Sequence, residues 1–413
     1  MKVAIVQSRP YQAFAGGDGA YVDGLVRHLE DIGCTVSGYT SGTTRGRPRM
    51  LVRLAYTREG RRPWRFRSAL RLGRYYLVLG PQLLRDAAGF LRAKYAGTAG
   101  TTSAFALAPD CREMAWVRRQ LDREAPDLAI LCFEAAAAAR VVADRAVKTL
   151  ALIGFLPNRS YAIAAAEPGA STGVVPPAFL SSIQEADYIS FNSRDDCRFA
   201  HHDLGLPKPV MIGMGFAQRR QQGAGDRPTV LFVGNKTGPN REAVAWFLDQ
   251  VWPWVIAGVP AARFRIVGRV AGYFGGSSPP GVDCVGEVEN LSDEYCAARV
   301  VVAPLRRGSA GVKTKVAEAI SFGCPIVTTS LGVDAVDLRQ IDHAGFVEDR
   351  PEDFAGRVID LLTDDALWRE KREGSDRVFD ALFSARAAYG ELDEIVASLN
   401  GGRLPAQAGE VSR

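Results

Sequence analysis

The stretch RRGSAGVKTKVAEA gathers small residues, two lysines and a glutamate in one part of the chain. Glycines between a strand and a helix leave backbone N–H groups free, and the positive end of the helix dipole attracts phosphate. We expect phosphate to lie on the amides of Ala310 and Gly311, with Lys313 or Lys315 neutralising its charge. Glu318 shares a helical face with Lys315 and is placed to accept hydrogen bonds from a sugar diol. A solvated Lys–Glu pair is the alternative for these two side chains.

A second glycine-containing loop lies near the start of the chain. The short apolar run VAIVQS predicts a strand, and Gly16, Gly17 and Gly19 separate it from a run with helical spacing. The loop lacks the GxGxxG spacing, and no acidic residue ends the next strand-like run, GYTSG, so a nicotinamide or flavin enzyme is disfavoured. Because glycine turns between strands and helices are common in purely structural roles, neither loop alone assigns a ligand.

The pattern around these loops predicts two domains. At 413 residues, 47% of them hydrophobic, the chain is long enough for two ordinary cores. Strand-like and helix-like runs alternate over residues 1–215 and again over 229–375, which predicts two α/β, Rossmann-like domains with parallel sheets covered by helices. The polar stretch 216–228 predicts a linker. We expect helices at 376–400 to pack back towards the first domain and residues 401–413 to be disordered.

Positive charge is concentrated in one segment. The formal net charge is +5, yet residues 45–95 carry fourteen Arg and Lys against Glu59 and Asp86, a local charge of +12. Within this basic insertion, about residues 45–100, the run RRPWRFRSALRLGRYYLVLG mixes arginines with aromatic and aliphatic residues. Such a composition suits a peripheral helix on an anionic membrane surface. A solvated insertion and a site for an anionic soluble acceptor are the alternatives, and no nucleic-acid fold accompanies the charge, so we expect no nucleic-acid partner.

The N-terminal residues and the cysteines indicate the compartment. MKVAIVQS lacks the apolar region and small-residue cleavage site of a secretory signal, and no later run approaches the roughly 18–20 apolar residues of a membrane span. The seven cysteines include no CxxC pair and lie mostly in apolar runs. We therefore expect a cytoplasmic protein with reduced cysteines and no bound metal. If the basic segment binds lipid, we expect the protein to lie on the inner face of the membrane.

Several motifs of the second half occur in a specific order: TVLFVGNKTGPNREAVAWFLDQVWPWV, FRIVG, VDCVGEV and VVVAPLRRGSAGVKTKVAEAISFGCPIVTT. In this order and spacing they resemble the donor-binding domain of the group 1 (family 4) retaining glycosyltransferases. The first half agrees more loosely, through GGDGAYVDGLVRHLEDIGCTV. The resemblance implies a GT-B architecture, with two Rossmann-like domains whose parallel sheets face each other across a cleft. It also implies sugar transfer from a nucleotide sugar with retention of configuration, without a metal ion and without a further cofactor.

The resemblance gives individual glycines and polar residues a role at the donor phosphates. Gly16 and Gly17 would approach these phosphates, with Gly19 in the same turn. Lys236, with Asn235 beside it in the loop after the first strand of the second domain, would face the pyrophosphate.

The remaining donor contacts follow from the same resemblance. Glu318 would hold the nucleotide ribose, and main-chain atoms from Val285 to Val288 would contact the base. Ala310 and Gly311 lie where the family binds the phosphates and the donor sugar.

Two departures from the family pattern concern its glutamate and its histidine. Many members carry two glutamates eight positions apart, and the first falls at Ala310 here. A subset with GxGxKxK before the remaining glutamate is similar to this loop, so we interpret the change as a variant site. The family histidine of the N-terminal domain is also missing, since no histidine lies between His28 and His201, and we expect both of these to be structural.

Candidate acceptor contacts follow two strand-like runs of the first domain. Asn158 and Arg159 come after TLALIGF, at the place that corresponds to the family histidine, and Glu134 comes directly after LAILCF. Side chains at strand ends of an α/β domain lie at the edge where ligands bind.

The chemistry of the predicted reaction assigns the catalytic groups. Transfer breaks the anomeric C–O bond through an oxocarbenium-like state while negative charge builds up on the departing diphosphate. Lys236, Lys315 and Glu318 are therefore the predicted catalytic residues, and the partners are a nucleotide sugar and a glycan, lipid-linked or small-molecule acceptor, as in polysaccharide biosynthesis. A nucleotide-sugar epimerase and a catalytically silent GT-B binding subunit remain as alternatives.

Overall fold

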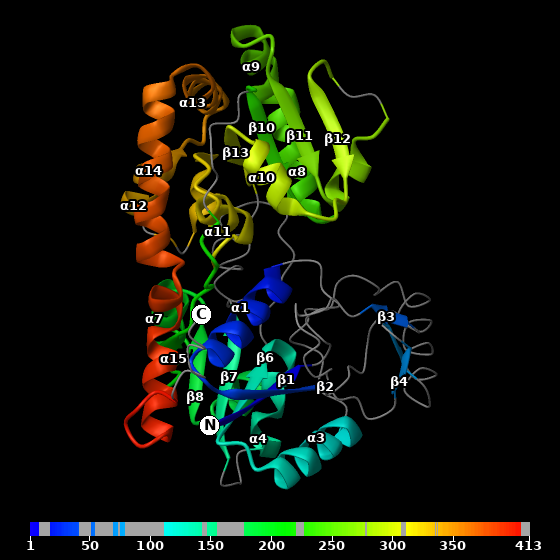
Figure 1. Cartoon of the computed structure of the whole chain (residues 1–413), viewed down its shortest axis with the longest axis vertical. Coiled ribbons are helices and arrows are strands. Elements are labelled where there is room, and N and C mark those ends of the chain that lie inside the picture. The colour runs from blue at the N-terminus through cyan, green and yellow to red at the C-terminus, as the bar shows by residue number, and fades with distance from the viewer. Residues whose placement is uncertain are drawn as a thin grey trace, which may run out of the picture. The chain divides into compact units, whose positions relative to one another are not determined.

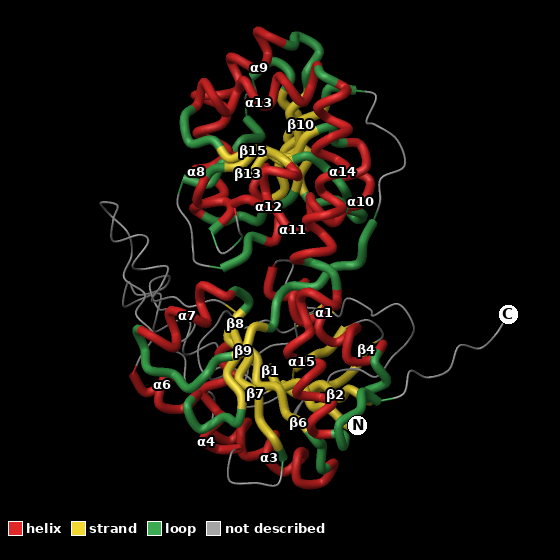
Figure 2. The backbone as a smooth tube through the Cα atoms, turned by 90° about the vertical axis from the view of Figure 1, so that its left-hand side faces the viewer, coloured by secondary structure: helices red, strands yellow, loops and turns green. Residues whose placement is uncertain are grey.

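The computed structural model describes residues 1–7, 17–40, 51–53, 69–72, 75–78, 111–142, 147–154, 177–219, 227–276, 279–306, 311–334, 336 and 338–405. They form two compact units: unit 1 is Met1–Ile212 together with Tyr389–Arg413, and unit 2 is Gly213–Ala388. Each unit is an α/β fold in which helices cover a parallel sheet (Figures 1 and 2). The predicted pair of Rossmann-like domains is confirmed.

Unit 1 is built on a six-stranded parallel sheet in the order β2-β1-β6-β7-β8-β9. Its strands are β1 (Lys2–Gln7), β2 (Thr35–Thr40), β6 (Leu128–Cys132), β7 (Lys148–Gly154), β8 (Tyr188–Phe191) and β9 (Val210–Met211). Its helices are α1 (Gly17–Asp31), α3 (Cys111–Glu124), the 3-10 helix η3 (Phe133–Ala138), α4 (Ala139–Val142), α6 (Pro177–Ile183), α7 (Arg194–His202) and the greater part of α15 (Ala385–Leu399).

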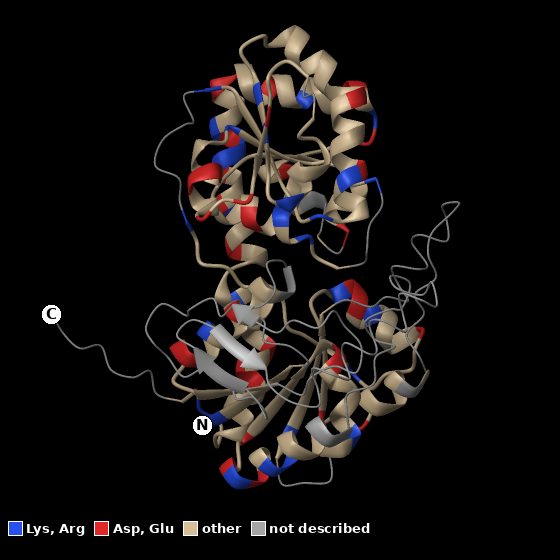
Figure 3. Cartoon of the chain, turned by 90° about the vertical axis from the view of Figure 1, so that its right-hand side faces the viewer, with Lys and Arg blue, Asp and Glu red and all other residues tan. Residues whose placement is uncertain are grey.

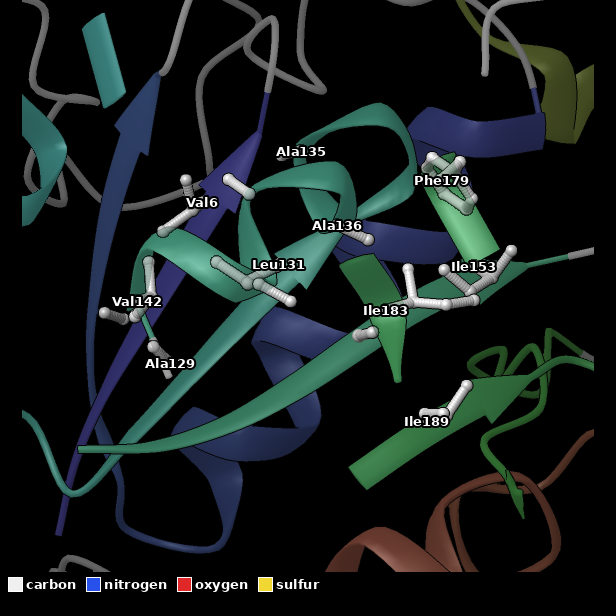
Figure 4. Packing of buried hydrophobic residues seen from close by; sticks show 14 of the residues in the cluster. Val6, Ala129, Leu131, Ala135, Ala136, Val142, Ile153, Phe179, Ile183 and Ile189 are labelled. Atoms are coloured by element: carbon white, nitrogen blue, oxygen red, sulfur yellow. The ribbon is translucent and has the colours of Figure 1, made fainter. Parts of the chain in front are cut away.

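The central strands of unit 1 are near-continuous apolar runs because helices cover both faces of their sheet. β6 is buried along its whole length, and β1 and β7 are buried after their first residue. Side chains such as Val6, Leu131 and Ile153 extend from these strands into one packed cluster (Figure 4). The helix α1 ends before Gly33, whose φ of 87° is the left-handed conformation in which glycine commonly ends a helix.

The C-terminal helix packs within unit 1 through specific side-chain contacts. The ring of His28 on α1 stacks on Tyr389 with centroids 4.5 Å apart, and its Nε2 lies 2.7 Å from Asp393 Oδ1. Glu391 Oε2 accepts a hydrogen bond of 2.9 Å from the backbone N–H of Met211 in β9. These contacts tie α15 to the first helix and the last strand of the unit.

The prediction of a helix in the basic insertion is wrong for its described residues. β3 (Leu51–Arg53), β5 (Tyr75–Val78) and β4 (Ala69–Leu72) form a three-stranded antiparallel sheet. Aromatic and branched residues favour extended backbone, which explains YYLV. The rest of residues 45–100 lies outside the described residues.

Unit 2 is built on a second parallel sheet, in the order β12-β11-β10-β13-β14-β15. Its strands are β10 (Thr229–Val233), β11 (Arg263–Val267), β12 (Val282–Gly286), β13 (Val300–Ala303), β14 (Ile326–Thr328) and β15 (Gly345–Val347). Its helices are α8 (Gly238–Trp246), η4 (Phe247–Val251), α9 (Trp252–Gly258), η5 (Arg269–Tyr273), α10 (Leu291–Ala297), α11 (Thr314–Ser321), η6 (Ser330–Val333), α12 (Leu338–Ala344), α13 (Pro351–Thr363) and α14 (Asp365–Leu382).

The first helical run of unit 2 is less regular than the sequence predicts. Its apolar spacing is typical of one continuous helix, but the run consists of α8, a π-helical turn η4 and α9. Pro253 near the start of α9 cannot donate the i→i−4 hydrogen bond, and a local change of helical pitch is a common response.

The surfaces of the two units carry mixed charge. Positions of Lys and Arg are interspersed with those of Asp and Glu over the described helices (Figure 3). Among the residues that the structure describes, no helix combines the length and the apolar character needed to cross a bilayer.

Candidate functional site

The order of the strands in unit 2 defines where a ligand is expected. The chain builds β10, β11 and β12 towards one side and then returns to add β13, β14 and β15 on the other side. In open α/β sheets, ligands bind beyond the carboxyl ends of the strands at such a reversal, here between β10 and β13. The loop after β10 carries Asn235 and Lys236, and the loop after β13 leads through Gly311 and Lys313 into α11.

Lys315, in the first turn of α11, is held between the two loops. Its Nζ donates a hydrogen bond of 3.0 Å to Asn240 Oδ1 and lies 5.3 Å from the centroid of the Phe232 ring. Burial, together with the neighbouring positive charge of Lys313, lowers the pKa of Lys315 to about 8, and the charge of Glu318 partly opposes this shift. The lysine is therefore mostly charged at neutral pH but able to lose its proton slightly above it.

Asn240 connects the loops on either side of the strand reversal. Its Oδ1 accepts from Lys315, and its Nδ2 donates 3.0 Å to the carbonyl oxygen of Asn235. The side chain of Asn235 in turn accepts a 3.4 Å hydrogen bond from Arg269. One amide side chain thus fixes Lys315 relative to the loop after β10.

Glu318 lies one turn further along α11 and is partly buried. Its Oε2 accepts a hydrogen bond of 2.9 Å from the hydroxyl of Tyr295. Burial raises the pKa of Glu318, and the Tyr295 hydrogen bond and the charge of Lys315 oppose this rise. Among the described ion pairs there is none between Lys315 and Glu318, so the solvated-pair alternative does not describe them.

The described end of the glycine loop, from Gly311 to Lys313, makes contacts of its own. Lys313 is buried, and its Nζ donates 2.7 Å to the carbonyl oxygen of Gly311. Gly311 has a φ of 87°, and its N–H donates 3.2 Å to Asp334 Oδ2. The amide predicted to bind phosphate therefore holds a carboxylate, which a ligand would have to displace, and Ala310 lies outside the described residues.

The other predicted donor residues of unit 2 lie at the same edge of the sheet. Lys236 is exposed, with its ammonium 5.0 Å from the centroid of the Tyr273 ring. Val285 is the next-to-last residue of the strand β12, before Gly286, whose φ is 83°, and Val288 follows in the loop. Both valines are partly buried against the core of the unit.

Unit 1 has its own strand reversal, between β1 and β6. Glu134 lies directly after β6 in the first turn of η3 and is partly buried. Gly17 is the first residue of α1, and Gly19 is buried in its first turn. Gly16, Asn158 and Arg159 lie outside the described residues.

Two features at the carboxyl edge of unit 1 have no signal in the sequence. Phe133, directly after β6, has a φ of 54°, a strained conformation for a bulky residue and one that collects at functional sites. Asn192, directly after β8, is 7% exposed, and its Oδ1 has no hydrogen-bond partner among the described residues. A buried acceptor of this kind is suited to a ligand hydroxyl.

In unit 2, sequence reasoning misses Asn240 and Tyr295. Asn240 is visible as a polar residue near the start of α8, but its partner Lys315 is 75 positions away. Tyr295 looks like an ordinary core aromatic of an amphipathic helix. Within the described part of the chain, no group of three or more His, Cys, Asp and Glu side chains is arranged to hold a metal ion.

Comparison with known protein families gives a match over part of the chain. Residues 227–364 match the sequence model of the family described as Glycosyl transferases group 1. This region contains the strand reversal, Lys315 and Glu318. A search of curated proteins gives no significant match.

Solved structures with the same fold span nearly the whole chain. Sucrose-phosphate synthase from Thermosynechococcus elongatus is similar with a TM-score of 0.66 and 16% identity, covering 98% of this chain and 100% of that chain. HepE from Anabaena, solved with UDP and glucose, gives a TM-score of 0.56 at 11% identity over 96% of this chain and 100% of that one. The lipopolysaccharide outer core galactosyltransferase WaaB gives 0.54 at 12% identity, with coverages of 96% and 99%. These similarities show that the fold is GT-B, and the family match over residues 227–364 supports a group 1 glycosyltransferase.

Proposed function

We propose that this chain is a retaining, metal-independent glycosyltransferase that binds a nucleotide sugar on unit 2 and transfers the sugar to a hydroxyl of a glycan or lipid-linked acceptor. The observation that carries the proposal is the arrangement on α11: Lys315 and Glu318 lie one turn apart at the strand reversal, each bound to a neutral partner rather than to each other. A diphosphate is complementary to the lysine, and a ribose diol is complementary to the carboxylate.

The charges of the site fit the departure of a diphosphate. As the anomeric C–O bond breaks, negative charge grows on the β-phosphate, and Lys315, Lys236 and the amides at the start of α11 would stabilise it. The acceptor oxygen forms the new bond to the anomeric carbon, and its proton passes to the departing diphosphate. The step needs no base from the protein, and it yields the glycoside and a nucleoside diphosphate.

The acceptor is proposed to bind at the carboxyl edge of unit 1. Glu134 lies at the strand reversal of that sheet, and the buried Oδ1 of Asn192 is ready to accept a hydrogen bond from a hydroxyl. A lipid-linked acceptor would agree with the charge of +12 over residues 45–95, which favours peripheral association with an anionic membrane on the cytoplasmic side. Flotation with anionic but not with neutral liposomes at moderate salt is the expected result, and no flotation would refute the membrane association.

Binding of nucleotides gives the first test of the donor site. Because HepE was solved with UDP, UDP is the first probe, with GDP and ADP as comparisons. We expect one of the three to raise the melting temperature of the wild-type chain, and Glu318→Ala to abolish that response. Glu134→Ala is the matched control, since it removes a carboxylate from unit 1 and should leave nucleotide binding unchanged.

Product analysis then tests the reaction itself. A radiolabelled nucleotide sugar should yield a glycoside, with the donor's anomeric configuration by NMR and with full activity in the presence of EDTA. A free epimerised nucleotide sugar would identify an epimerase, and donor binding without turnover on a broad acceptor panel would identify a binding subunit. Stabilisation by a nucleotide that survives Glu318→Ala would contradict the donor site.

A further inference from the structure

We propose that Tyr295 is a positioning residue for the donor: its hydroxyl holds one oxygen of the Glu318 carboxylate so that the other oxygen faces the nucleotide ribose. The proposal deepens the proposed function and rests on its donor site. It concerns a residue of α10 that the sequence presents only as part of a helix core.

The contact is direct and well placed. Tyr295 donates 2.9 Å to Oε2 of Glu318 from a side chain that is 0% exposed. Within the described residues, Oε1 of Glu318 accepts no hydrogen bond, and the residue keeps part of its surface open. One carboxylate oxygen is therefore occupied by the protein and the other is available.

The ring of Tyr295 is held by a stack of flat groups. Phe322 lies parallel to it, with centroids 4.7 Å apart and an angle of 8° between the planes. The guanidinium of Arg219 lies 5.4 Å from the centroid of the Phe322 ring. The Sγ of Cys324 donates 3.2 Å to the backbone carbonyl of Tyr295. These contacts hold the ring, and with it the hydroxyl oxygen, beside Glu318.

A fixed carboxylate matters for binding a diol. The last torsion of a glutamate side chain is broad, so an unrestrained carboxylate samples many orientations. Because Tyr295 already holds one oxygen, the Glu318 side chain loses less conformational freedom when a ligand binds. A carboxylate that is preorganised in this way binds the ribose hydroxyls more tightly. Burial raises the pKa of Glu318, and the hydrogen bond from Tyr295 opposes this rise. The hydrogen bond therefore favours the charged carboxylate, which is the form that accepts hydrogen bonds best.

The test compares the wild-type chain with Tyr295→Phe, using isothermal titration with UDP and with 2′,3′-dideoxy-UDP, or with the matching GDP pair where the nucleotide panel selects GDP. The matched control is Tyr39→Phe in unit 1, where another fully buried tyrosine donates to a glutamate, Glu124. We expect Tyr295→Phe to bind UDP about ten-fold more weakly, the size of one charge-assisted hydrogen bond. Its affinity for the dideoxy analogue should stay at the wild-type value, and Tyr39→Phe should match the wild type with both probes.

A pH series provides a second readout that a structural role would not move. UDP affinity should fall on the acid side as Glu318 takes up a proton, and in Tyr295→Phe this fall should begin at higher pH, because the variant lacks a donor that favours the carboxylate. The ratio of the affinities for UDP and the dideoxy analogue measures ribose discrimination. If this ratio is the same in Tyr295→Phe as in the wild type, whether or not both affinities fall, the proposal is overturned.

A wrong donor site and a wrong role for Tyr295 give different experimental results. If Glu318→Ala loses ribose discrimination and Tyr295→Phe retains it, the donor site stands and the role of Tyr295 falls. If the wild-type chain binds none of UDP, GDP and ADP, the donor site itself falls, and the role of Tyr295 falls with it.

Discussion

Raising the pH above 8 should weaken nucleotide binding through a single lysine. Lys315 has a pKa of about 8 in the ligand-free protein because it is buried and because Lys313 adds a second positive charge. A bound diphosphate places negative charge beside Lys315 and should raise its pKa, so binding is accompanied by proton uptake.

The size of the effect follows from this value. At pH 9 a group with a pKa of about 8 is about one-tenth protonated, whereas at pH 7 it is about nine-tenths protonated. If the pKa in the complex is near 10 or above, the observed affinity falls about ten-fold from pH 7 to pH 9. The nucleotide contributes little over this interval, because phosphate groups complete their second ionisation near pH 6.

Isothermal titration measures both the affinity and the proton uptake. Repeating each titration in buffers of different ionisation enthalpy should give about half a proton taken up per nucleotide at pH 8. Lys315→Arg is the matched variant, because a guanidinium stays charged throughout and should bind with an affinity that is flat from pH 7 to pH 9. Equal affinities of the wild type at pH 7 and pH 9, or a pH dependence that persists in Lys315→Arg, would show that Lys315 does not carry the effect.

Three further predictions concern stability and the glycine loops. Lys315→Met should raise the free energy of unfolding at pH 7 by up to about 3 kcal/mol, because a lysine whose pKa is lowered in the folded state destabilises the fold below pH 8. Urea titrations should show this gain shrinking as the pH rises from 8 towards 10.5, the ordinary pKa of lysine. Gly268→Ala should lower the free energy of unfolding by at least about 2 kcal/mol, because the φ of Gly268 is 93° and a Cβ there would lie 2.4 Å from the carbonyl oxygen of Gly234. Gly272→Ala is the control: a Cβ at Gly272 would meet no atom within 4 Å, so this change should cost less than about 1 kcal/mol. Asp334→Ala should lower the Kd for UDP about three-fold or more, because it releases the backbone N–H of Gly311. A raised or unchanged Kd would show that this N–H does not bind phosphate.

The sequence predicts the sheets well because their signal is local. Apolar runs such as LAILC and VVVA, separated by helical periodicity, are sufficient to indicate buried parallel strands. The positive φ of Gly33 at the end of α1 is equally local. In the basic insertion the density of arginine indicates charge but not local structure, and β4 pairs with β5 as antiparallel strands.

The partners of the site residues are a different problem, because they come from distant parts of the chain. The types of Lys315 and Glu318 indicate a donor site from sequence alone. Asn240 is 75 residues from Lys315 and Tyr295 is 23 residues from Glu318, and only the strand order of unit 2 brings these pairs together. No sequence pattern specifies which polar residue of α8 or which aromatic residue of α10 reaches α11.

The way in which Lys315 and Glu318 are held argues for a ligand rather than for stability alone. Burial favours the neutral form of each side chain, so it lowers the pKa of the lysine and raises the pKa of the glutamate. A direct ion pair would relieve both shifts, and the one-turn spacing on α11 allows it. Instead each is held by a neutral side chain, Asn240 or Tyr295, so each keeps hydrogen-bonding capacity for another molecule. Strongly shifted pKa values of buried groups are typical of functional sites, and a molecule with a diphosphate at one end and a diol one helical turn away would satisfy both groups at once.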